Sequence, residues 1–333
     1  MLDRILTVRV DRITRLTPEV SSFELVHPAG RSLPAYEAGA HIDVHLPGGF
    51  MRTYSLARAP QPAVQGVAGT AAGASGPARY CIGVKREPAS RGGSAALHER
   101  VRAGDLLAIG SPRNTFPLQA GARHHLLMAG GIGLTPLLAM AQQLARDGAA
   151  FTLCVFARSR ALLPFADELA ALGDAVRLHL DDPAEPEKLD LRVLLAAPAP
   201  APGTHLYLCG PAGFMQAALA AAAHWPEDAV HLEYFAPPEG DAAQGEDQPF
   251  VLRLARRGIE VPVAADASAV DALHDLGIDV PTSCAQGVCG TCVVPWTAGE
   301  PEHRDHCLSA TERRHKLALC CSRAKTAVLE VDL

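Results

Sequence analysis

The stretch Cys284-Ala-Gln-Gly-Val-Cys289-Gly-Thr-Cys292 places three cysteines in the pattern C-x4-C-x2-C, and Cys320 follows at a distance. Thiolates at such short spacing bind metal, and one tight loop can bring three of them together. Gly287 allows the backbone to turn closely around such a centre. The N–H groups of the loop can then point at the sulfurs and tune them. The stretch therefore predicts a metal centre held by thiolates.

The spacing is typical of plant-type [2Fe–2S] ferredoxins. A zinc site with four thiolates would use the same residues, although zinc ribbons usually contain two C-x2-C pairs. The fourth ligand is open between Cys320 and the adjacent Cys321, and Cys307 lies nearer to the triple in the sequence.

Length and composition describe a protein of several domains. The chain has 333 residues, of which 48% are hydrophobic, so two or three domains with real cores are expected. A net charge of −6 argues against a general nucleic-acid binder. No stretch has the length and apolar character of a membrane span or a signal peptide. Nine cysteines, an odd number, favour a metal site in a reducing compartment, and a soluble cytoplasmic protein is expected.

Residues 1–118 have the pattern of a small antiparallel β-barrel. Residues 5–14 and 22–27 alternate apolar with polar side chains, and residues 41–46 end at a Pro-Gly-Gly turn. Many short strands with such turns predict a barrel. Residues 61–78 are rich in Ala, Gly and Pro and are expected to form a surface insertion without assigned chemistry.

Within this segment, Arg52-Thr53-Tyr54-Ser55-Leu56 combines a cation, an aromatic ring and a hydroxyl. The chain resembles the barrel reductases of the ferredoxin-reductase superfamily here, because they carry R-x-Y-S at this point. The tyrosine would pack against an isoalloxazine ring, the serine would lie near its N5, and the arginine would pair with phosphate. An ordinary amphipathic strand would account for the same residues.

A second motif downstream supports a flavin. Val84 and Lys85 precede Gly92-Gly93-Ser94, which opens a predicted helix. Free N–H groups and the helix dipole would make this turn a phosphate cradle, although such a sequence is also common in loops. A terminal monophosphate suits FMN, and FAD is less expected because no adenine site is evident.

Residues 119–236 alternate strands with helices and predict an α/β domain with a parallel sheet. The turn Gly130-Gly131-Ile132-Gly133-Leu134-Thr135-Pro136 follows a buried strand, and Cys209-Gly210-Pro211 ends a later one. This pair of turns resembles the nucleotide domain of the same superfamily. The resemblance implies a pyrophosphate at Gly131 and Gly133, with Ser55, Thr135 and Cys209 lining the hydride-transfer site. A plain tight turn and a buried cysteine are the alternatives.

Two further positions concern the cofactors. Arg158 and Ser159 follow the second strand of this domain, where an arginine can accept the 2′-phosphate of NADPH. Relatives of similar architecture use NADH, which is the preferred prediction. Phe235 stands where relatives place an aromatic residue by the flavin, and packing in a core is the alternative.

Residues 237–248 are polar, acidic and rich in Gly and Pro, which predicts a linker. Residues 249–333 then follow the order strand, strand, helix, cysteine loop and closing strand. This is the order of an α+β ferredoxin domain of the β-grasp kind.

Flavin barrel, nucleotide domain and ferredoxin together resemble the family of phthalate dioxygenase reductase and vanillate O-demethylase reductase. In this family the ligand is the cysteine that opens C-x-S-R-A-K, which implies Cys320. The resemblance implies electron transfer from NADH through FMN and [2Fe–2S] to a Rieske-type terminal oxygenase. The substrate of that oxygenase, whether an aromatic acid, a methoxy-aromatic or an amine, is not evident from the sequence.

Three other functions fit parts of the pattern. They are a flavin and iron–sulfur enzyme acting directly on a small substrate, an electron-transfer module of a larger complex, and a zinc-bearing regulator. Arg323 and Lys325 lie just beyond Cys320, and they either steer an acidic partner or form a solvated charge pair.

Overall fold

A computed structural model describes residues 5–61, 76–88, 92–184, 188–196, 201–238 and 247–333. The chain divides into two compact units, one ending at Leu232 and the other running from Glu233 to Leu333. Most of the predicted insertion at 61–78 and of the predicted linker at 237–248 lies outside the described residues. No helix among the described residues is long and apolar enough to cross a membrane.

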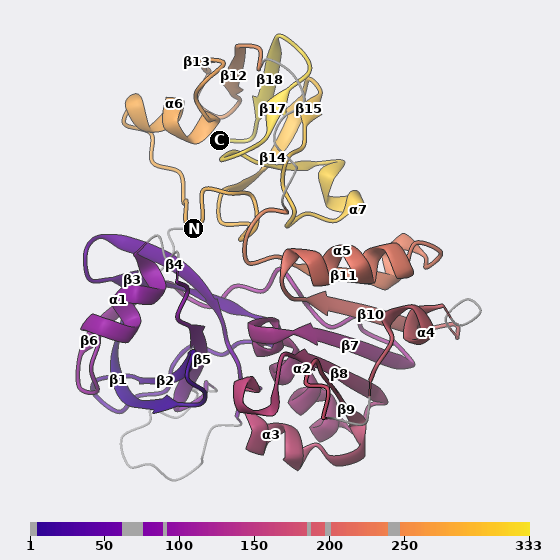
Figure 1. Ribbon diagram of the computed structural model, residues 1–333. Coiled ribbons are helices and arrows are strands. Elements are labelled where there is room, and N and C mark those ends of the chain that lie inside the picture. The colour runs from indigo at the N-terminus through magenta and orange to yellow at the C-terminus, as the bar shows by residue number, and fades with distance from the viewer. Residues whose placement is uncertain (1–4, 62–75, 89–91, 185–187, 197–200, 239–246) are drawn as a thin grey trace. The chain divides into compact units, whose positions relative to one another are not determined.

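The first unit begins with a nearly closed antiparallel barrel (Figure 1). Its strands are β1 (Leu6–Arg15), β2 (Val20–Val26), β3 (His41–Leu46), β4 (Phe50–Ser55), β5 (Arg79–Lys85) and β6 (Leu106–Ile109), in the order β4-β3-β6-β1-β2-β5. A bridge between Leu56 and Ile82 links the two edge strands. Alternation explains the strands, since Val8 and Val10 are buried while Arg9 between them is exposed. The helix α1 (Gly93–Arg100) follows β5.

A five-stranded sheet completes this unit, in the order β11-β10-β7-β8-β9. The strands are β7 (His124–Gly130), β8 (Phe151–Ala157), β9 (Val176–Leu180), β10 (Thr204–Cys209) and β11 (Val230–Glu233), and β10, β7, β8 and β9 are parallel. The helices are α2 (Leu134–Asp147), α3 (Ala166–Ala171), α4 (Leu191–Leu195) and α5 (Ala212–Ala221), with short 3-10 turns η1 (Gly131–Gly133), η2 (Arg160–Leu162), η3 (Gly173–Ala175) and η4 (Glu227–Ala229). Figure 1 shows α2 and α3 on one side of the sheet and α4 and α5 on the other.

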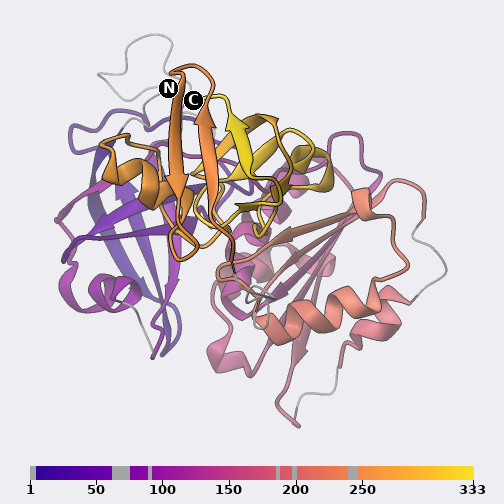
Figure 2. The ribbon, with the colours of Figure 1, turned by 90° about the horizontal axis from the view of Figure 1, so that it is seen from above.

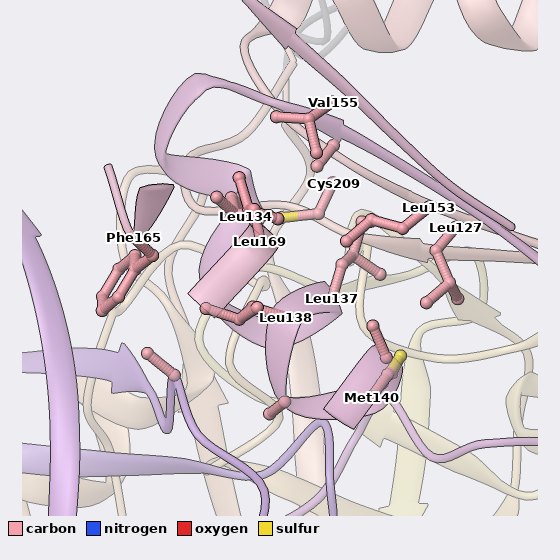
Figure 3. Packing of buried hydrophobic residues seen from close by; sticks show 14 of the residues in the cluster. Leu127, Leu134, Leu137, Leu138, Met140, Leu153, Val155, Phe165, Leu169 and Cys209 are labelled. Carbon is pink, nitrogen blue, oxygen red and sulfur yellow. The ribbon is translucent and has the colours of Figure 1, made fainter. Parts of the chain in front are cut away.

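The apolar face of α2 forms the centre of the largest core. Leu134, Leu137 and Leu138 are fully buried against Leu127 and Leu153 of the sheet, as Figure 3 shows. The helix ends at Gly148, whose φ of 66° suits glycine at this position. This packing fixes the start of α2 at the carboxyl edge of the sheet.

Polar contacts join the barrel to the sheet within this unit. Arg58, which follows β4, pairs with Glu24 of β2 at 2.8 Å and with Glu168 of α3 at 2.9 Å. The Ala59 amide donates to Gln142 of α2 at 3.0 Å. The end of β4 is therefore fixed relative to α2 and α3.

The second unit is an α+β fold. Its strands are β12 (Phe250–Leu254), β13 (Ile259–Val263), β14 (Val293–Ala298), β15 (Pro301–Glu302), β16 (Lys316–Ala318), β17 (Arg323–Ala324) and β18 (Val328–Val331). The main sheet has the order β13-β12-β18-β14-β16, and β15 pairs with β17. In Figure 2 the yellow β18 lies beside the orange β12, with which it is parallel. The helices are α6 (Ala269–Asp275) and α7 (Ala310–Arg313).

Local sequence explains the limits of α6. A capping box between Ser268 and Asp271 begins it, and Gly277 follows its end with a φ of 69°. The predicted fold class, an antiparallel barrel, a parallel α/β sheet and an α+β ferredoxin fold, is confirmed.

Candidate functional site

The cysteine loop lies between α6 and β14, and strand register brings the fourth cysteine to it. Cys292 directly precedes β14, in which Val293 pairs with Ala318 of β16. The Leu319 amide extends the ladder by donating to the Cys292 carbonyl at 3.2 Å. Cys320 therefore stands at the same end of the strand pair as Cys292.

The four predicted ligands lie close to one another. Cys284 interacts with Cys289, and Cys292 interacts with both Cys289 and Cys320, while Cys320 also interacts with the adjacent Cys321. In the described part of the chain, no group of three or more Cys, His, Asp or Glu side chains is arranged to hold a single metal ion. Four neighbouring cysteines in the spacing C-x4-C-x2-C with a distant fourth suit a [2Fe–2S] cluster, in which each iron takes two thiolates.

Backbone amides converge on the first pair. The Gln286 amide donates to Cys284 Sγ at 3.3 Å. The pKa of the Cys284 thiol falls to about 6, chiefly because Cys289 donates to it, with further donation from the amides of Gln286, Val288 and Cys289 against the effect of burial. Donors aimed at sulfur stabilise a thiolate, so the loop is built for thiolate ligands.

Left-handed residues give the loop this shape. Ala285, Gly287 and Gly290 have φ values of 52°, 73° and 72°. A Cβ on Gly287 would lie 2.6 Å from the sulfur of Cys321 and 3.1 Å from Cα of Asp305. Gly287 is therefore required both by its conformation and by its close neighbours.

Cys321 and Cys307, the two alternatives for the fourth ligand, have different surroundings from Cys320. Cys321 lies against Gly287 and donates to the Ala318 carbonyl at 3.8 Å, so Cys320 is the member of the adjacent pair whose thiol meets Cys292. Burial raises the pKa of Cys307 to about 12, and the nearby Asp305 adds to this.

The suggestion that Arg323 steers a partner is wrong, because only 5% of this residue is exposed. Its guanidinium donates to the carbonyls of Gln248 at 2.8 Å and Ala264 at 3.0 Å, so it holds the fold together. Lys325 is exposed and pairs with Glu300 at 2.7 Å.

In the barrel, hydrogen bonds hold the predicted flavin strand β4. Thr53 donates to Asp43 of β3 at 2.9 Å, and Arg113 pairs with the other carboxylate oxygen at 2.5 Å. Ser55 is buried at the end of the strand. Asp43 and Arg113 carry no sequence motif, so the sequence could not identify them as supports of β4.

Two neighbours of Ser55 in the motif, Tyr54 and Leu56, pack in or against the barrel core. Tyr54 packs against the barrel core, and burial raises its pKa to about 12. Leu56 is fully buried in the barrel core and its backbone makes the bridge to Ile82. The side chain of Leu56 is therefore a core residue.

The fold brings Arg52 to the predicted phosphate turn. A Cβ on Gly93 would lie 2.6 Å from Cγ of Arg52, so this side chain lies directly against the start of α1. Gly92 precedes the helix with a φ of 93° and, as a glycine, offers no capping side chain of its own. Ser94 Oγ accepts from the Glu87 amide at 3.2 Å. A cation beside a helix N-terminus suits a phosphate group.

The two residues predicted beside this turn lie on β5. Val84 is buried in the barrel core, and its carbonyl is 3.0 Å from Nε2 of His98 in α1. Lys85 lies 3.4 Å from Glu87. The contact through His98 fixes α1, and therefore the phosphate turn, against β5.

The two glycine turns of the nucleotide domain interlock. Cys209 pairs in register with Ala129, so β10 and β7 end side by side. A Cβ on Gly133 would overlap the Cys209 carbonyl, and one on Gly210 would lie 3.0 Å from Cα of Gly130. The glycines therefore permit a backbone approach that any side chain would prevent. Pro211 then precedes α5.

Two of the predicted hydride-site residues are buried here. Thr135 donates to the Ile132 carbonyl at 3.0 Å, and its methyl group would lie 2.8 Å from a Cβ on Gly83 of β5. Cys209 is fully buried, and Figure 3 shows its sulfur beside Leu134. Its backbone stands at the edge of the sheet while its thiol belongs to the core. Gly131, at the start of η1, has a φ of 53°.

The remaining predicted residues lie at surfaces. Arg158 is 63% exposed and pairs with Glu19 of the barrel, which the sequence did not indicate. Ser159 precedes η2 in an extended conformation. Phe235 belongs to the second unit and is 45% exposed, so the alternative that it packs in a core is wrong.

Comparison with known proteins agrees with this geometry. The model of the 2Fe-2S iron-sulfur cluster binding domain matches residues 252–325. The vanillate O-demethylase oxidoreductase of Pseudomonas sp. (strain HR199 / DSM 7063) is 43% identical over 98% of this chain and 99% of its own.

Solved structures show the same architecture. Phthalate dioxygenase reductase, described as a modular structure for electron transfer from pyridine nucleotides to [2Fe–2S], is 35% identical over 99% of this chain and 98% of its own, with a TM-score of 0.68. An intact type IV self-sufficient cytochrome P450 monooxygenase is 34% identical over 99% of this chain, with a TM-score of 0.86. The match covers 41% of that longer chain.

Proposed function

The chain belongs to the family of oxygenase reductases that includes phthalate dioxygenase reductase and vanillate O-demethylase oxidoreductase, and we propose that it delivers electrons from NADH to a Rieske-type terminal oxygenase. A flavin accepts a hydride and releases electrons singly, and a [2Fe–2S] cluster passes single electrons on. The cysteines at 284, 289, 292 and 320 carry this proposal, because their spacing and the matching 2Fe-2S domain at residues 252–325 support a binuclear cluster.

The barrel residues hold the flavin. Arg52 and the amides at Gly92 and Gly93 bind its phosphate, since the arginine side chain lies against the start of α1. A single phosphate cradle favours FMN over FAD. Ser55 lies at the end of β4 toward the isoalloxazine, and Tyr54 packs along the ring.

The interlocked turns bind the pyridine nucleotide. The backbone at Gly131, Gly133 and Gly210 can approach a pyrophosphate because no side chain intervenes. Thr135 contacts β5 at Gly83 and so links the start of α2 to the flavin strands. Cys209 contributes its backbone beside the nicotinamide while its thiol keeps the edge packed.

The ferredoxin unit holds the cluster through Cys284, Cys289, Cys292 and Cys320. The amides around Cys284 donate to its sulfur, which stabilises the thiolate form. We place the protein in the cytoplasm, where cysteines remain reduced and available as ligands.

Cofactor content is the first test. Protein purified without oxygen should contain two iron atoms and two acid-labile sulfides per chain, with flavin of the mass of FMN. Zinc without sulfide would contradict the iron–sulfur proposal. FAD in place of FMN would contradict only the assignment of the phosphate cradle.

Electron delivery is the second test. NADH should reduce both ferricyanide and cytochrome c, and a Rieske oxygenase should turn over only when this reductase is added. Turnover of an aromatic substrate by the reductase alone would instead support a self-contained enzyme. Failure of NADH to reduce any acceptor would support a passive electron-transfer module.

A further inference from the structure

An ion pair joins the nucleotide sheet to the barrel at the position predicted to meet the adenosine ribose. Arg158 directly follows β8, the second strand of the nucleotide domain. In such sheets an acid at this position binds the ribose 2′-hydroxyl, or an arginine accepts a 2′-phosphate. Here Nη2 of Arg158 donates to both carboxylate oxygens of Glu19, each at 2.7 Å.

The backbone of Glu19 is held firmly between β1 and β2. Its amide donates to Oγ1 of Thr17 at 3.2 Å, and its carbonyl accepts from the Arg86 amide at 2.7 Å. Thr17 itself is buried. The carboxylate of Glu19 therefore extends from a fixed turn of the barrel toward the end of β8.

This pair is accessible to a ligand. The side chain of Arg158 is 63% exposed and that of Glu19 is 36% exposed. Exposed ion pairs contribute little to stability, so the pair is not needed to hold the two sheets together. The charges of Arg158 and Glu19 instead act on a ligand that binds at this edge of the sheet.

Other charges near β8 do not replace Glu19. Asp181, after β9, donates its amide to the Ala157 carbonyl at 3.1 Å, so a second carboxylate stands by the end of β8. Its side chain is 67% exposed and lies 3.2 Å from His179. Arg160 begins η2 two residues beyond Arg158. Side chains of both charges therefore lie at this edge of the sheet. Glu19 is the carboxylate that pairs with Arg158, the arginine nearest the end of β8, and so it controls whether Arg158 can bind a phosphate.

We infer that Glu19 sets the selectivity of this reductase for NADH over NADPH. Its carboxylate occupies the guanidinium that would bind a 2′-phosphate, and it places a negative charge where that phosphate would stand. A 2′-hydroxyl meets neither obstacle and can donate to the carboxylate. This inference rests on the proposed function, because it assigns a role at the same nucleotide site.

The test compares Glu19→Gln, Arg158→Gln and the double variant. Binding of adenosine 2′,5′-bisphosphate and of adenosine 5′-monophosphate is measured by calorimetry, which requires no hydride transfer. Glu19→Gln should strengthen binding of the bisphosphate relative to the monophosphate by about tenfold, because a charged hydrogen bond is gained and a repulsion is lost. In the Arg158→Gln background the same change should give a smaller gain, because only the repulsion is then relieved.

Steady-state rates give a second readout. With ferricyanide as acceptor, the ratio of kcat/KM for NADPH to that for NADH should rise by the same factor in Glu19→Gln. Asp332→Asn is the matched control, because Asp332 forms a similar exposed two-oxygen pair with Arg256 at 2.6 Å in the ferredoxin unit. It should leave the ratio unchanged.

The possible outcomes distinguish failure of the Glu19 inference from failure of the proposed function. Equal changes for both nucleotides in Glu19→Gln, or a gain that is undiminished without Arg158, would overturn the role of Glu19. A holoprotein that oxidises neither NADH nor NADPH would instead overturn the proposed function, whatever the calorimetry shows. Oxidation of NADH with an unchanged ratio in Glu19→Gln would leave the proposed function intact and reject this inference.

Discussion

The cysteine loop of the ferredoxin unit and the nucleotide edge of the other unit are assembled in different ways. Three of the four predicted cluster ligands lie within nine residues, and the register of β14 and β16 supplies Cys320. The proposed nucleotide edge comprises the interlocked turns at 130–135 and 209–211, together with Arg158 and its partner Glu19 of the barrel. A site formed by one loop is encoded locally, whereas a site between two sheets depends on how those sheets pack.

Loss of one cluster ligand should have the largest effect. In Cys289→Ser the iron and sulfide content should fall to background, and NADH-dependent reduction of cytochrome c should be abolished, because hydroxyl oxygen is a poor substitute for thiolate toward iron. Reduction of ferricyanide should persist, since the residues that we propose for the flavin and nucleotide sites lie in the other unit. Visible absorption, metal analysis and both assays check this.

Cys321→Ser is the control for that variant. Cys321 lies next to Cys320, yet its thiol donates to the Ala318 carbonyl. The cluster spectrum should therefore survive in Cys321→Ser and disappear in Cys320→Ser. The reverse result would reassign the fourth ligand.

The proposed nucleotide edge should lose stability when a closely packed glycine is replaced. Gly133→Ala would place a methyl group against the Cys209 carbonyl, and the backbone must move apart. We expect the free energy of unfolding of this unit to fall by about 2–3 kcal/mol. The measurement is urea unfolding followed through Trp225 in a Trp296→Phe background, since these are the only tryptophans.

Gly213→Ala provides the comparison. Gly213 lies within α5, and a Cβ there would meet nothing within 4 Å. Alanine should raise the free energy of unfolding by about 0.5–1 kcal/mol, because glycine is a poor helix residue. Similar losses in both variants would show that the close approach at Gly133 is not what requires glycine.

These contrasts explain what the sequence could predict. The cysteine spacing, the alternation in the barrel strands and the glycine turns all act over short distances, so the three folds could be predicted, and the site residues drawn from these motifs stay predictions. The signals that limit α6, the capping box at Ser268 and the left-handed Gly277, are equally local.

Contacts between residues far apart in the chain could not be predicted from the sequence. Arg323 resembled a surface cation, yet its guanidinium is enclosed by the carbonyls of Gln248 and Ala264. In the sequence, Asp43 looks like an ordinary strand residue. Only the structure shows that Arg113, far along the chain, pairs with it. Glu19 lies in a barrel turn with no motif, and only the packing of the two sheets gives it a partner.

The first unit should also respond to acid through a stack of histidines. His231 lies 4.5 Å from Tyr207, ring to ring, and its Nε2 is 3.0 Å from Nδ1 of His205. Burial, with smaller effects of the neighbouring His205 and His125 and against that of Asp228, lowers the pKa of His231 to about 4. The folded unit thus favours neutral His231.

The sign of the effect follows from this lowered pKa. Unfolded chains bind a proton at His231 near pH 6.5, whereas the folded unit binds it only near pH 4, so stability is lost as the pH falls through this window. Between pH 7.5 and pH 5 the loss from this group should be about 1–2 kcal/mol. His231→Gln should reduce the pH dependence measured through Trp225, and the exposed His224→Gln should not.

The flavin phosphate cradle has the smallest expected effect and tests whether its two segments act together. Arg52→Gln should raise the dissociation constant of FMN from the apoprotein by about tenfold, because a charged donor beside α1 is lost. Arg9→Gln, on the same barrel but paired with Asp11, should not change it. Flavin fluorescence titration measures both. If Arg52→Gln binds FMN like the wild type, the turn at Gly92 and Gly93 is sufficient by itself, and the phosphate cradle belongs with the cysteine loop among the locally encoded sites.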